Sequence, residues 1–133
     1  MHFQTRSLRA VALLITGGCL ALGSAHANPA DNDAAMLKLA NDRGCMACHN
    51  ILPMAPRADG LPPLAPAWRD VALKYRDDPR AYERLTRTVL TGSDPRASHW
   101  LGRVGAVTMP PNAVAISEAD AQMLVNWILV LVP

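Results

Sequence analysis

The sequence has little cysteine and few aromatic residues, and the patterns of several common protein classes are missing from it. Its 133 residues include three cysteines, and aromatic residues make up 5% of the chain. No alternating strand pattern and no internal repeat occur, which argues against β-rich and repeat folds. The sequence also lacks the basic patch that is typical of nucleic-acid-binding proteins. An apolar run, residues 10–22, is shorter than the roughly 20 residues that cross a membrane.

Residues 1–27 instead have the pattern of a cleavable signal peptide. Arg6 and Arg9 precede the apolar run, and Ala25-His26-Ala27 has the small-x-small pattern at which signal peptidase cuts. We therefore expect export to the periplasm and a single domain of residues 28–133, without stable membrane insertion after cleavage. A retained membrane anchor is the alternative.

Removal of this leader changes both the cysteine count and the net charge. Cys19 leaves with the leader, so that Cys45 and Cys48 remain. Arg6 and Arg9 are two of the 13 basic residues, which leaves 11 basic against 11 acidic side chains in the domain. A neutral domain suggests only modest electrostatic steering of partners. A domain of this size also has a thin core, to which a covalently held cofactor would add stability.

Helical patterns predict an all-α fold of about four short helices joined by long loops. The expected helices are residues 34–41, 68–75, 78–91 and 117–131. Prolines and glycine make residues 50–66 a loop, and residues 91–116 show no regular period. We expect Leu124 and Ile128 of the last helix to pack against the first helix near Leu39 and Ala40.

Cys45-Met46-Ala47-Cys48-His49 matches Cys-x-x-Cys-His, the signal for covalent attachment of c-type haem. Two thiols at this spacing can form thioethers with the two vinyl groups on one side of a porphyrin. The residue after the second cysteine then lies against the ring, where imidazole is a neutral nitrogen donor suited to haem iron. The motif predicts one haem c, bonded to Cys45 and Cys48, with His49 as an iron ligand.

Three other interpretations of the cysteine pair have less support. A disulfide between Cys45 and Cys48 is possible in an oxidising compartment. A thioredoxin-like redox pair needs a βαβ context, which this sequence lacks. A structural zinc site needs four ligands, and beyond the motif only one further histidine, His99, remains after signal cleavage.

The second axial ligand of the iron is chosen from the remaining methionines and His99. Met109 lies in the irregular segment and is followed by Pro110-Pro111, which stiffen the backbone and help to hold a loop rigidly. The other methionines lie in expected helices or too near His49 to reach the opposite face of the ring: Met36, Met46, Met54 and Met123. His99 as ligand stays an alternative and would lower the reduction potential.

Three stretches together resemble the class I c-type cytochromes, most closely the small bacterial cytochrome c-551/c-552 type. They are residues 43–49 (RGCMACH), residues 66–75 (PAWRDVALKY), and residues 109–114 (MPPNAV) with the helix that ends in Trp127-Ile128-Leu129. The likeness spans most of residues 28–133 in matching order, so the combination is specific.

The resemblance implies a class I cytochrome c fold wrapped around one covalent haem. By position it implies that Met109 is the distal iron ligand and that the Pro66 carbonyl accepts the His49 ring N–H, which orients the imidazole. It also implies that Trp100 hydrogen-bonds a haem propionate. The spacings are longer than in compact family members, and we expect the extra residues around 54–63 and 93–105 to reshape the surface near the haem edge.

These features together predict a periplasmic one-electron carrier rather than an enzyme. Iron held by both His49 and Met109 has no open position for a substrate. Partners are expected to be a redox protein donor and acceptor, docking transiently at the haem edge. One alternative is a haem c subunit of a periplasmic dehydrogenase. Another is a five-coordinate haem sensor or peroxidase, in which His99 would be the distal acid–base group.

Overall fold

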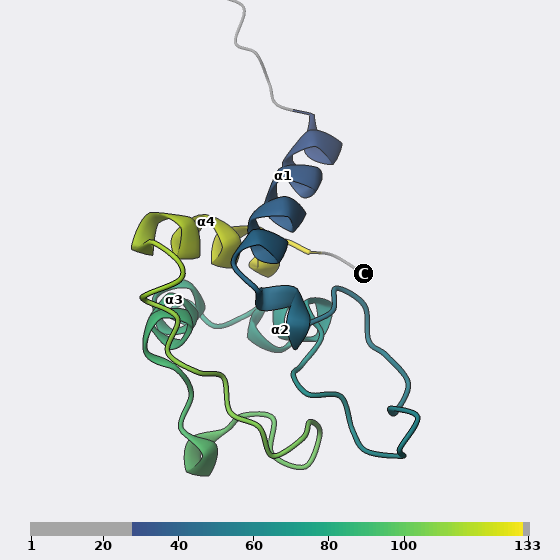
Figure 1. Ribbon diagram of the computed structural model, residues 1–133. Coiled ribbons are helices and arrows are strands. Elements are labelled where there is room, and N and C mark those ends of the chain that lie inside the picture. Colours follow the sequence, from purple (N-terminus) through teal and green to yellow (C-terminus); the bar gives the residue numbers. More distant parts are fainter. Residues whose placement is uncertain (1–27, 132–133) are drawn as a thin grey trace, which may run out of the picture.

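The computed structural model describes residues 28–131, which form four α-helices and two short 3₁₀ turns, without strands in that range (Figure 1). The helices are α1 (Pro29–Asp42), α2 (Trp68–Tyr75), α3 (Ala81–Thr91) and α4 (Glu118–Leu129), and the turns are η1 (Cys45–Ala47) and η2 (Pro95–Ala97). The all-α prediction is confirmed. The expected signal peptide, residues 1–27, lies outside the described residues. Between residues 28 and 131, no helix has the length and apolar character needed to cross a membrane.

Local capping explains where α1 and α4 begin. α1 starts at Pro29, five residues before the expected start, because the Asn28 side chain accepts a hydrogen bond from the Ala30 N–H and proline suits the first helical position. α4 starts as expected, with Ser117 Oγ accepting from the Asp120 N–H at 3.1 Å. Acidic residues in the first turn add a favourable interaction with the helix dipole.

Helix α4 is the element against which α1, α2 and α3 all pack (Figure 1). The buried cluster joins Ala40 of α1 and Trp68 of α2 to Leu124, Trp127 and Ile128 of α4. The Trp68 and Trp127 rings meet edge to face with centroids 5.6 Å apart, a favourable aromatic geometry. The expected packing of the last helix on the first is confirmed at Ala40.

Two polar contacts also join α1 to α4. The buried Trp127 indole donates from Nε1 to Asp33 Oδ1 at 2.7 Å, so its one polar atom is satisfied. At the other end of α1, Arg43 Nη2 lies 3.1 Å from Asp120 Oδ2. The exposed ion pair contributes at most about 1 kcal/mol, and the hydrogen bond to a buried indole matters more.

Two large apolar side chains, one on α3 and one on α4, are about half exposed. Tyr82 of α3 is 42% exposed and Met123 of α4 is 49% exposed. In α4 the buried positions run through Ala121, Leu124 and Ile128, which follow the three- and four-residue spacing of one helical face. Met123 lies one position before that face and is therefore turned away from the core.

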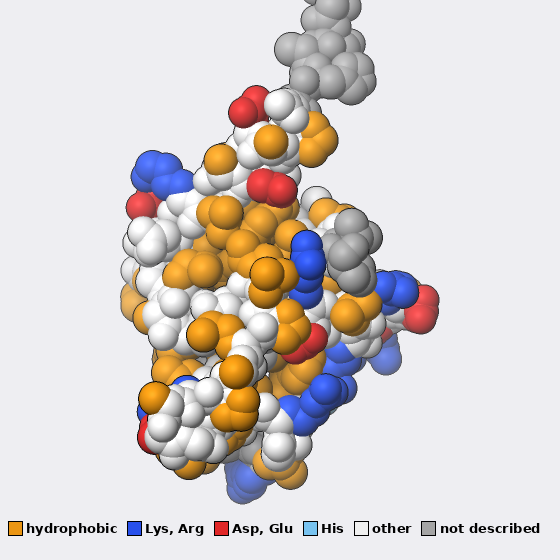
Figure 2. All heavy atoms as spheres, turned by 90° about the vertical axis from the view of Figure 1, so that its right-hand side faces the viewer, with side chains coloured by type: hydrophobic (Ala, Val, Ile, Leu, Met, Phe, Trp, Pro, Cys, Tyr) orange, Lys and Arg blue, Asp and Glu red, His pale blue; other side chains and the backbone are white. Residues whose placement is uncertain are grey.

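Charge is divided unevenly over a domain that is neutral in total. Residues 51–108, which hold α2, α3 and the long loops, carry nine Lys and Arg against six Asp and Glu. The rest of the described chain, which holds α1 and α4, carries two basic against five acidic side chains. Figure 2 shows most Lys and Arg of one face gathered in its lower half. The molecule therefore has a positive and a negative end.

The packing of α4 makes Leu124 a test of the core. Leu124 is 2% exposed, and truncation of such a leucine costs about 2–5 kcal/mol. We expect Leu124→Ala to lower the free energy of unfolding by this amount in chemical denaturation of the haem-loaded protein. Met123→Ala, on the exposed face of the same helix, is the control and should change it by about 0.5 kcal/mol or less. Equal losses in both variants would contradict the burial of Leu124.

Candidate haem site

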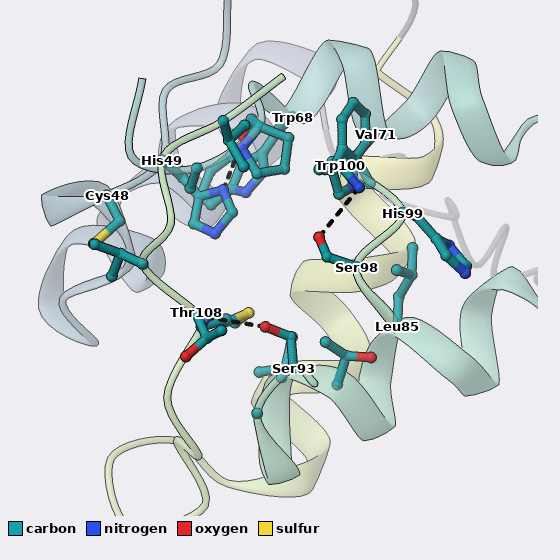
Figure 3. A pocket seen from close by; sticks show the side chains of 18 of the residues that line it. Cys48, His49, Trp68, Val71, Leu85, Ser93, Ser98, His99, Trp100 and Thr108 are labelled. Carbon is teal, nitrogen blue, oxygen red and sulfur yellow. Dashed lines mark hydrogen bonds between the residues drawn. The ribbon is translucent and has the colours of Figure 1, made fainter. Parts of the chain in front are cut away.

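A cavity of about 310 Å³ lies between α2, α3 and the segment that follows α3 (Figure 3). Cofactor and ligand pockets range from about 300 to 1,000 Å³, so the volume suits a bound group. Apolar side chains form most of the lining, among them Leu64, Val71, Leu85, Val89 and Ile128. Cys48, His49 and Met109, which sequence reasoning selected, line the same cavity although Met109 is distant in the sequence.

The His49 ring is held in one orientation by two neighbours. Its Nδ1 lies 2.9 Å from the Pro66 carbonyl oxygen, and the ring stacks on Trp68 with centroids 5.7 Å apart. Burial lowers the pKa of His49, and the bond to Pro66 opposes this shift in part. The neutral imidazole therefore donates Nδ1–H to the carbonyl and leaves the Nε2 lone pair free. In Figure 3 the ring faces across the cavity toward Ser93 and Thr108.

The two cysteines belong to a compact turn at the end of α1. Gly44 has φ 75°, which ends the helical path, and η1 follows directly. The Cys45 carbonyl accepts from the N–H groups of Cys48 and His49 at 3.3 and 3.1 Å. The two sulfur atoms are not joined in a disulfide, and both residues are partly buried. Burial raises the pKa of the Cys45 thiol, so it stays protonated at neutral pH.

Met109 is held by a two-way contact with Ser93. Its N–H donates to Ser93 Oγ at 3.0 Å, and its carbonyl accepts from the Ser93 N–H at 3.0 Å. Beyond the two prolines, the Asn112 side chain donates to the Val89 and Pro110 carbonyls at 3.1 and 2.7 Å. The methionine segment is therefore tied to the end of α3 at Met109 itself and again at Asn112, three residues later.

Close contact between the end of α3 and the segment that contains Met109 depends on Gly92. This residue has φ 83° and ψ 177°, a backbone region that is almost restricted to glycine. A Cβ atom there would lie 2.9 Å from the Met109 carbonyl oxygen and 3.0 Å from the Pro111 nitrogen. Gly92 therefore permits both the turn after α3 and the approach of the methionine segment.

Trp100 lies in the cavity wall next to Ser98, whose Oγ accepts from the Trp100 N–H at 3.2 Å. Two cations lie over its ring: Lys74 Nζ is 5.2 Å and Arg103 Cζ is 5.9 Å from the ring centroid. Pro66, the other residue suggested by resemblance, also lines the cavity.

His99 is exposed, and its Nδ1 lies 2.6 Å from the Tyr75 hydroxyl. Burial raises the pKa of that phenol, opposed by the Arg84 guanidinium 5.1 Å from the Tyr75 ring centroid. Tyr75 therefore remains neutral and can donate its hydroxyl hydrogen to the His99 ring nitrogen. Arg84 is a basic residue of the cavity wall and also pairs with Asp78.

Sequence reasoning missed Gly92, Ser93, Trp68 and Arg84 as parts of the site. Gly92 directly follows the expected helix 78–91, and nothing local indicates that Ser93 binds a residue 16 positions away. Trp68 begins the expected helix 68–75, and its stacking on His49 cannot be predicted from residue spacing. These roles come from tertiary contacts.

The side chains present fit a haem c. The apolar wall suits a porphyrin, an oriented imidazole and a thioether sulfur line one cavity, and the two thiols are free. Histidine and methionine are a known axial pair for the iron of c-type cytochromes. Within residues 28–131, no group of three His, Cys, Asp or Glu side chains gathers in a way that could hold a metal ion on its own.

Comparison with known proteins gives relatives of one kind. The chain is 39% identical over 93 residues to cytochrome c-551 of Allochromatium vinosum, covering 70% of this chain and 82% of the relative. It is 33% identical over 119 residues to cytochrome c-551 of Pseudomonas aeruginosa, covering 90% and 91%. The crystal structure of cytochrome c552 from Nitrosomonas europaea matches with a TM-score of 0.54 and 35% identity, covering 71% of this chain and 98% of that one. No family model matches the sequence.

Fold, cavity and relatives together define a small class I c-type cytochrome, a protein of electron transfer with one covalently attached haem c. Within that class, the chain belongs to the cytochrome c-551/c-552 family. The prediction made from the motif and the resemblance is confirmed for family, fold and cofactor.

The contact at Gly92 gives a test of how the methionine segment is held. Alanine there combines an unfavourable backbone conformation, worth about 1–3 kcal/mol, with the clash against Met109. We expect Gly92→Ala to lower the free energy of unfolding of the haem-loaded protein by at least this amount, measured by chemical denaturation. Gly102→Ala is the control, because Gly102 also has a positive φ, 76°, but its Cβ would meet nothing within 4 Å. If the two variants lose the same stability, the close approach of Gly92 to Met109 and Pro111 does not contribute to the stability of the protein.

Proposed function

We propose that the protein is an exported one-electron carrier of the periplasm whose haem is attached through Cys45 and Cys48 and whose iron is bound by His49 and Met109. The observation that carries this proposal is that His49 and Met109 line one cavity and are each held by hydrogen bonds to other segments. Bound haem iron supplies the one-electron chemistry by alternating between the ferric and ferrous states.

His49 is suited to its role by the contacts around its ring. The Pro66 carbonyl takes the Nδ1 hydrogen, so the lone pair on Nε2 is the one available to iron. Stacking on Trp68 prevents rotation of the ring, and a hydrogen bond to Nδ1 makes the imidazole a better donor. These contacts support His49 as the proximal ligand.

Met109 is suited to the opposite position because hydrogen bonds fix its own N–H and carbonyl and the segment that follows it. The two bonds to Ser93 and the Asn112 bonds keep the thioether against the cavity, and a ligand so fixed need not move when an electron arrives. A methionine ligand and an apolar pocket both favour the ferrous state and raise the potential. A second axial ligand also leaves no open iron position, which supports a carrier over an enzyme.

Two observations favour this ligand set over its rivals. The His99 ring is engaged with the Tyr75 hydroxyl at 2.6 Å, which supports Met109 rather than His99 as the ligand. The tight anchoring of Met109 supports a closed distal side over the five-coordinate sensor or peroxidase. A haem subunit of a dehydrogenase would have the same site and would differ only in a lasting contact with its partner.

Trp100 is proposed as a neighbour of a haem propionate. Its ring is part of the cavity wall, and Ser98 Oγ accepts from the Trp100 backbone N–H at 3.2 Å, which helps to hold the residue at that wall. The indole N–H is the donor that a propionate oxygen would accept from.

Residues 1–27 are proposed to be a signal peptide that directs the domain 28–133 to the periplasm. The support is the order of arginines, apolar run and Ala25-His26-Ala27 in the sequence. Transient redox partners there would bury less than about 1,200 Å² in total, counted over both proteins.

Absorption spectra of Met109→Ala and His99→Ala test the ligand set. We expect the exported wild type to show covalent c-type haem, a far-red sulfur-to-iron band in the oxidised state, and no carbon monoxide binding in the reduced state. Met109→Ala should lose the far-red band and bind carbon monoxide, because it removes the thioether. His99→Ala should keep the wild-type spectra. A wild type that lacks the band and binds carbon monoxide readily would instead support the open, five-coordinate site.

Analysis of the exported protein tests the leader. Expressed with its own leader in a bacterium that matures c-type cytochromes, the periplasmic protein should begin at Asn28 and carry the mass of one haem, as measured by N-terminal sequencing and intact mass. The matched control lacks residues 2–27 and should stay in the cytoplasm without covalent haem. Recovery of the wild type with residues 1–27 still attached would contradict cleavage after Ala27.

A further inference from the structure

A second hollow lies on the outer side of Trp100. This groove, called here the Trp100 groove, has a volume of about 250 Å³. It lies between the proline-rich loop, residues 50–66, and residues 100–104, and the Gly105 N–H joins the two segments by donating to the Pro63 carbonyl at 2.8 Å. Trp100 and Val104 line both this groove and the haem cavity. The groove is therefore one side chain away from the cavity.

The two cations over Trp100 have no acidic partner in the part of the chain that the structure describes. Six other basic side chains do form ion pairs there: Lys38, Arg43, Arg57, Arg84, Arg87 and Arg96. Lys74 and Arg103 are exposed, and the charged group of each lies over the indole ring. Within residues 28–131, three other basic residues, Arg69, Arg76 and Arg80, also form no ion pair. Asp70 also lines the groove, but it lies in the first turn of α2, where the helix dipole stabilises a carboxylate.

Apolar side chains stand exposed around the same groove. Met54, which lines it, is 60% exposed, and Leu101, next to Trp100, is 81% exposed. Leu52, which also lines the groove, is 52% exposed, and Leu61, adjacent in sequence to the lining residue Pro62, is 53% exposed. Single exposed apolar residues are ordinary, but several around one groove, beside unpaired cations, are typical of a surface that another protein covers.

We propose that the Trp100 groove is the docking site for an electron-transfer protein whose docking face carries carboxylates around an apolar centre. Carboxylates would pair with Lys74 and Arg103, and an apolar side chain would enter between Met54 and Trp100. The excess of basic residues in 51–108 adds attraction at longer range. This inference rests on the proposed carrier function and specifies which face the partner uses.

The test compares two double variants of the haem-loaded protein that remove the same charge. Lys74→Gln with Arg103→Gln, called here the groove variant, removes the two cations over the Trp100 ring, of which Arg103 also lines the groove. Lys38→Gln with Arg87→Gln is the control variant; it removes one lysine and one arginine that are exposed on α1 and α3 and absent from the groove lining.

Two measurements compare the variants with the wild type. Oxidation of each reduced protein is followed by stopped flow with anionic hexacyanoferrate(III) and with cationic tris(phenanthroline)cobalt(III). A peptide of alternating glutamate and leucine serves as binding probe, observed at the Trp100 indole N–H by NMR of the reduced protein.

In wild type we expect low salt to accelerate the reaction with hexacyanoferrate(III) and the peptide to shift the Trp100 indole signal. The groove variant should lose both effects, with a rate roughly tenfold lower at low salt, while its rate with the cobalt complex does not fall. The control variant should keep the indole shift and most of the rate. Equal losses in the two variants, or no indole shift in wild type, would overturn the proposal.

The absorption spectrum of each variant separates this inference from the proposed function. All four substituted residues lie outside the haem attachment motif and the axial pair, so covalent haem and the far-red band should persist in both variants. A protein that keeps these spectra but fails the docking tests would remain an electron carrier with another docking face. Loss of the spectra in wild type would instead refute the proposed ligand set.

Discussion

The haem site depends on three hydrogen bonds that join the segment after Cys48 to the start of α2. The Pro66 carbonyl accepts from His49 Nδ1, and the carbonyls of Asn50 and Ile51 accept from the first two N–H groups of α2 at 2.9 and 3.1 Å. Ala67 stands at the N-cap and offers no side-chain oxygen. The loop carbonyls therefore replace the missing cap, and the same strip of backbone that begins the helix orients the imidazole.

Through this strip His49, the proposed iron ligand, becomes part of the hydrophobic core. His49 stacks on Trp68, Trp68 meets the edge of Trp127, and Trp127 donates to Asp33 of α1. A small domain buries a limited share of its surface, so it gains when a cofactor-binding side chain also packs. Loss of the imidazole orientation and loss of the core contacts are for this reason coupled events.

How far the sequence could predict this site depends on the range of each interaction. The Cys-x-x-Cys-His motif is local, and its chemistry follows from spacing alone, so the cofactor was predictable. The start of α4 follows from Ser117, although α1 began earlier than apolar periodicity suggested because Asn28 caps it. The anchoring of Met109 by Ser93 was not predictable, because no local pattern reports a contact between distant residues.

The mutual bonds between Ser93 and Met109 also close the intervening residues into a loop with a fixed base. Since the base is held by backbone groups and one hydroxyl, the number of residues inside the loop has little influence on where the thioether lies. The entropic cost of closing a loop rises only slowly with its length, so insertions there lower the stability of the fold only slightly. Evolution, or a protein engineer, can thus change or lengthen the part of this stretch that does not line the haem cavity, such as residues 101–103, and alter partner recognition while the cavity wall is kept.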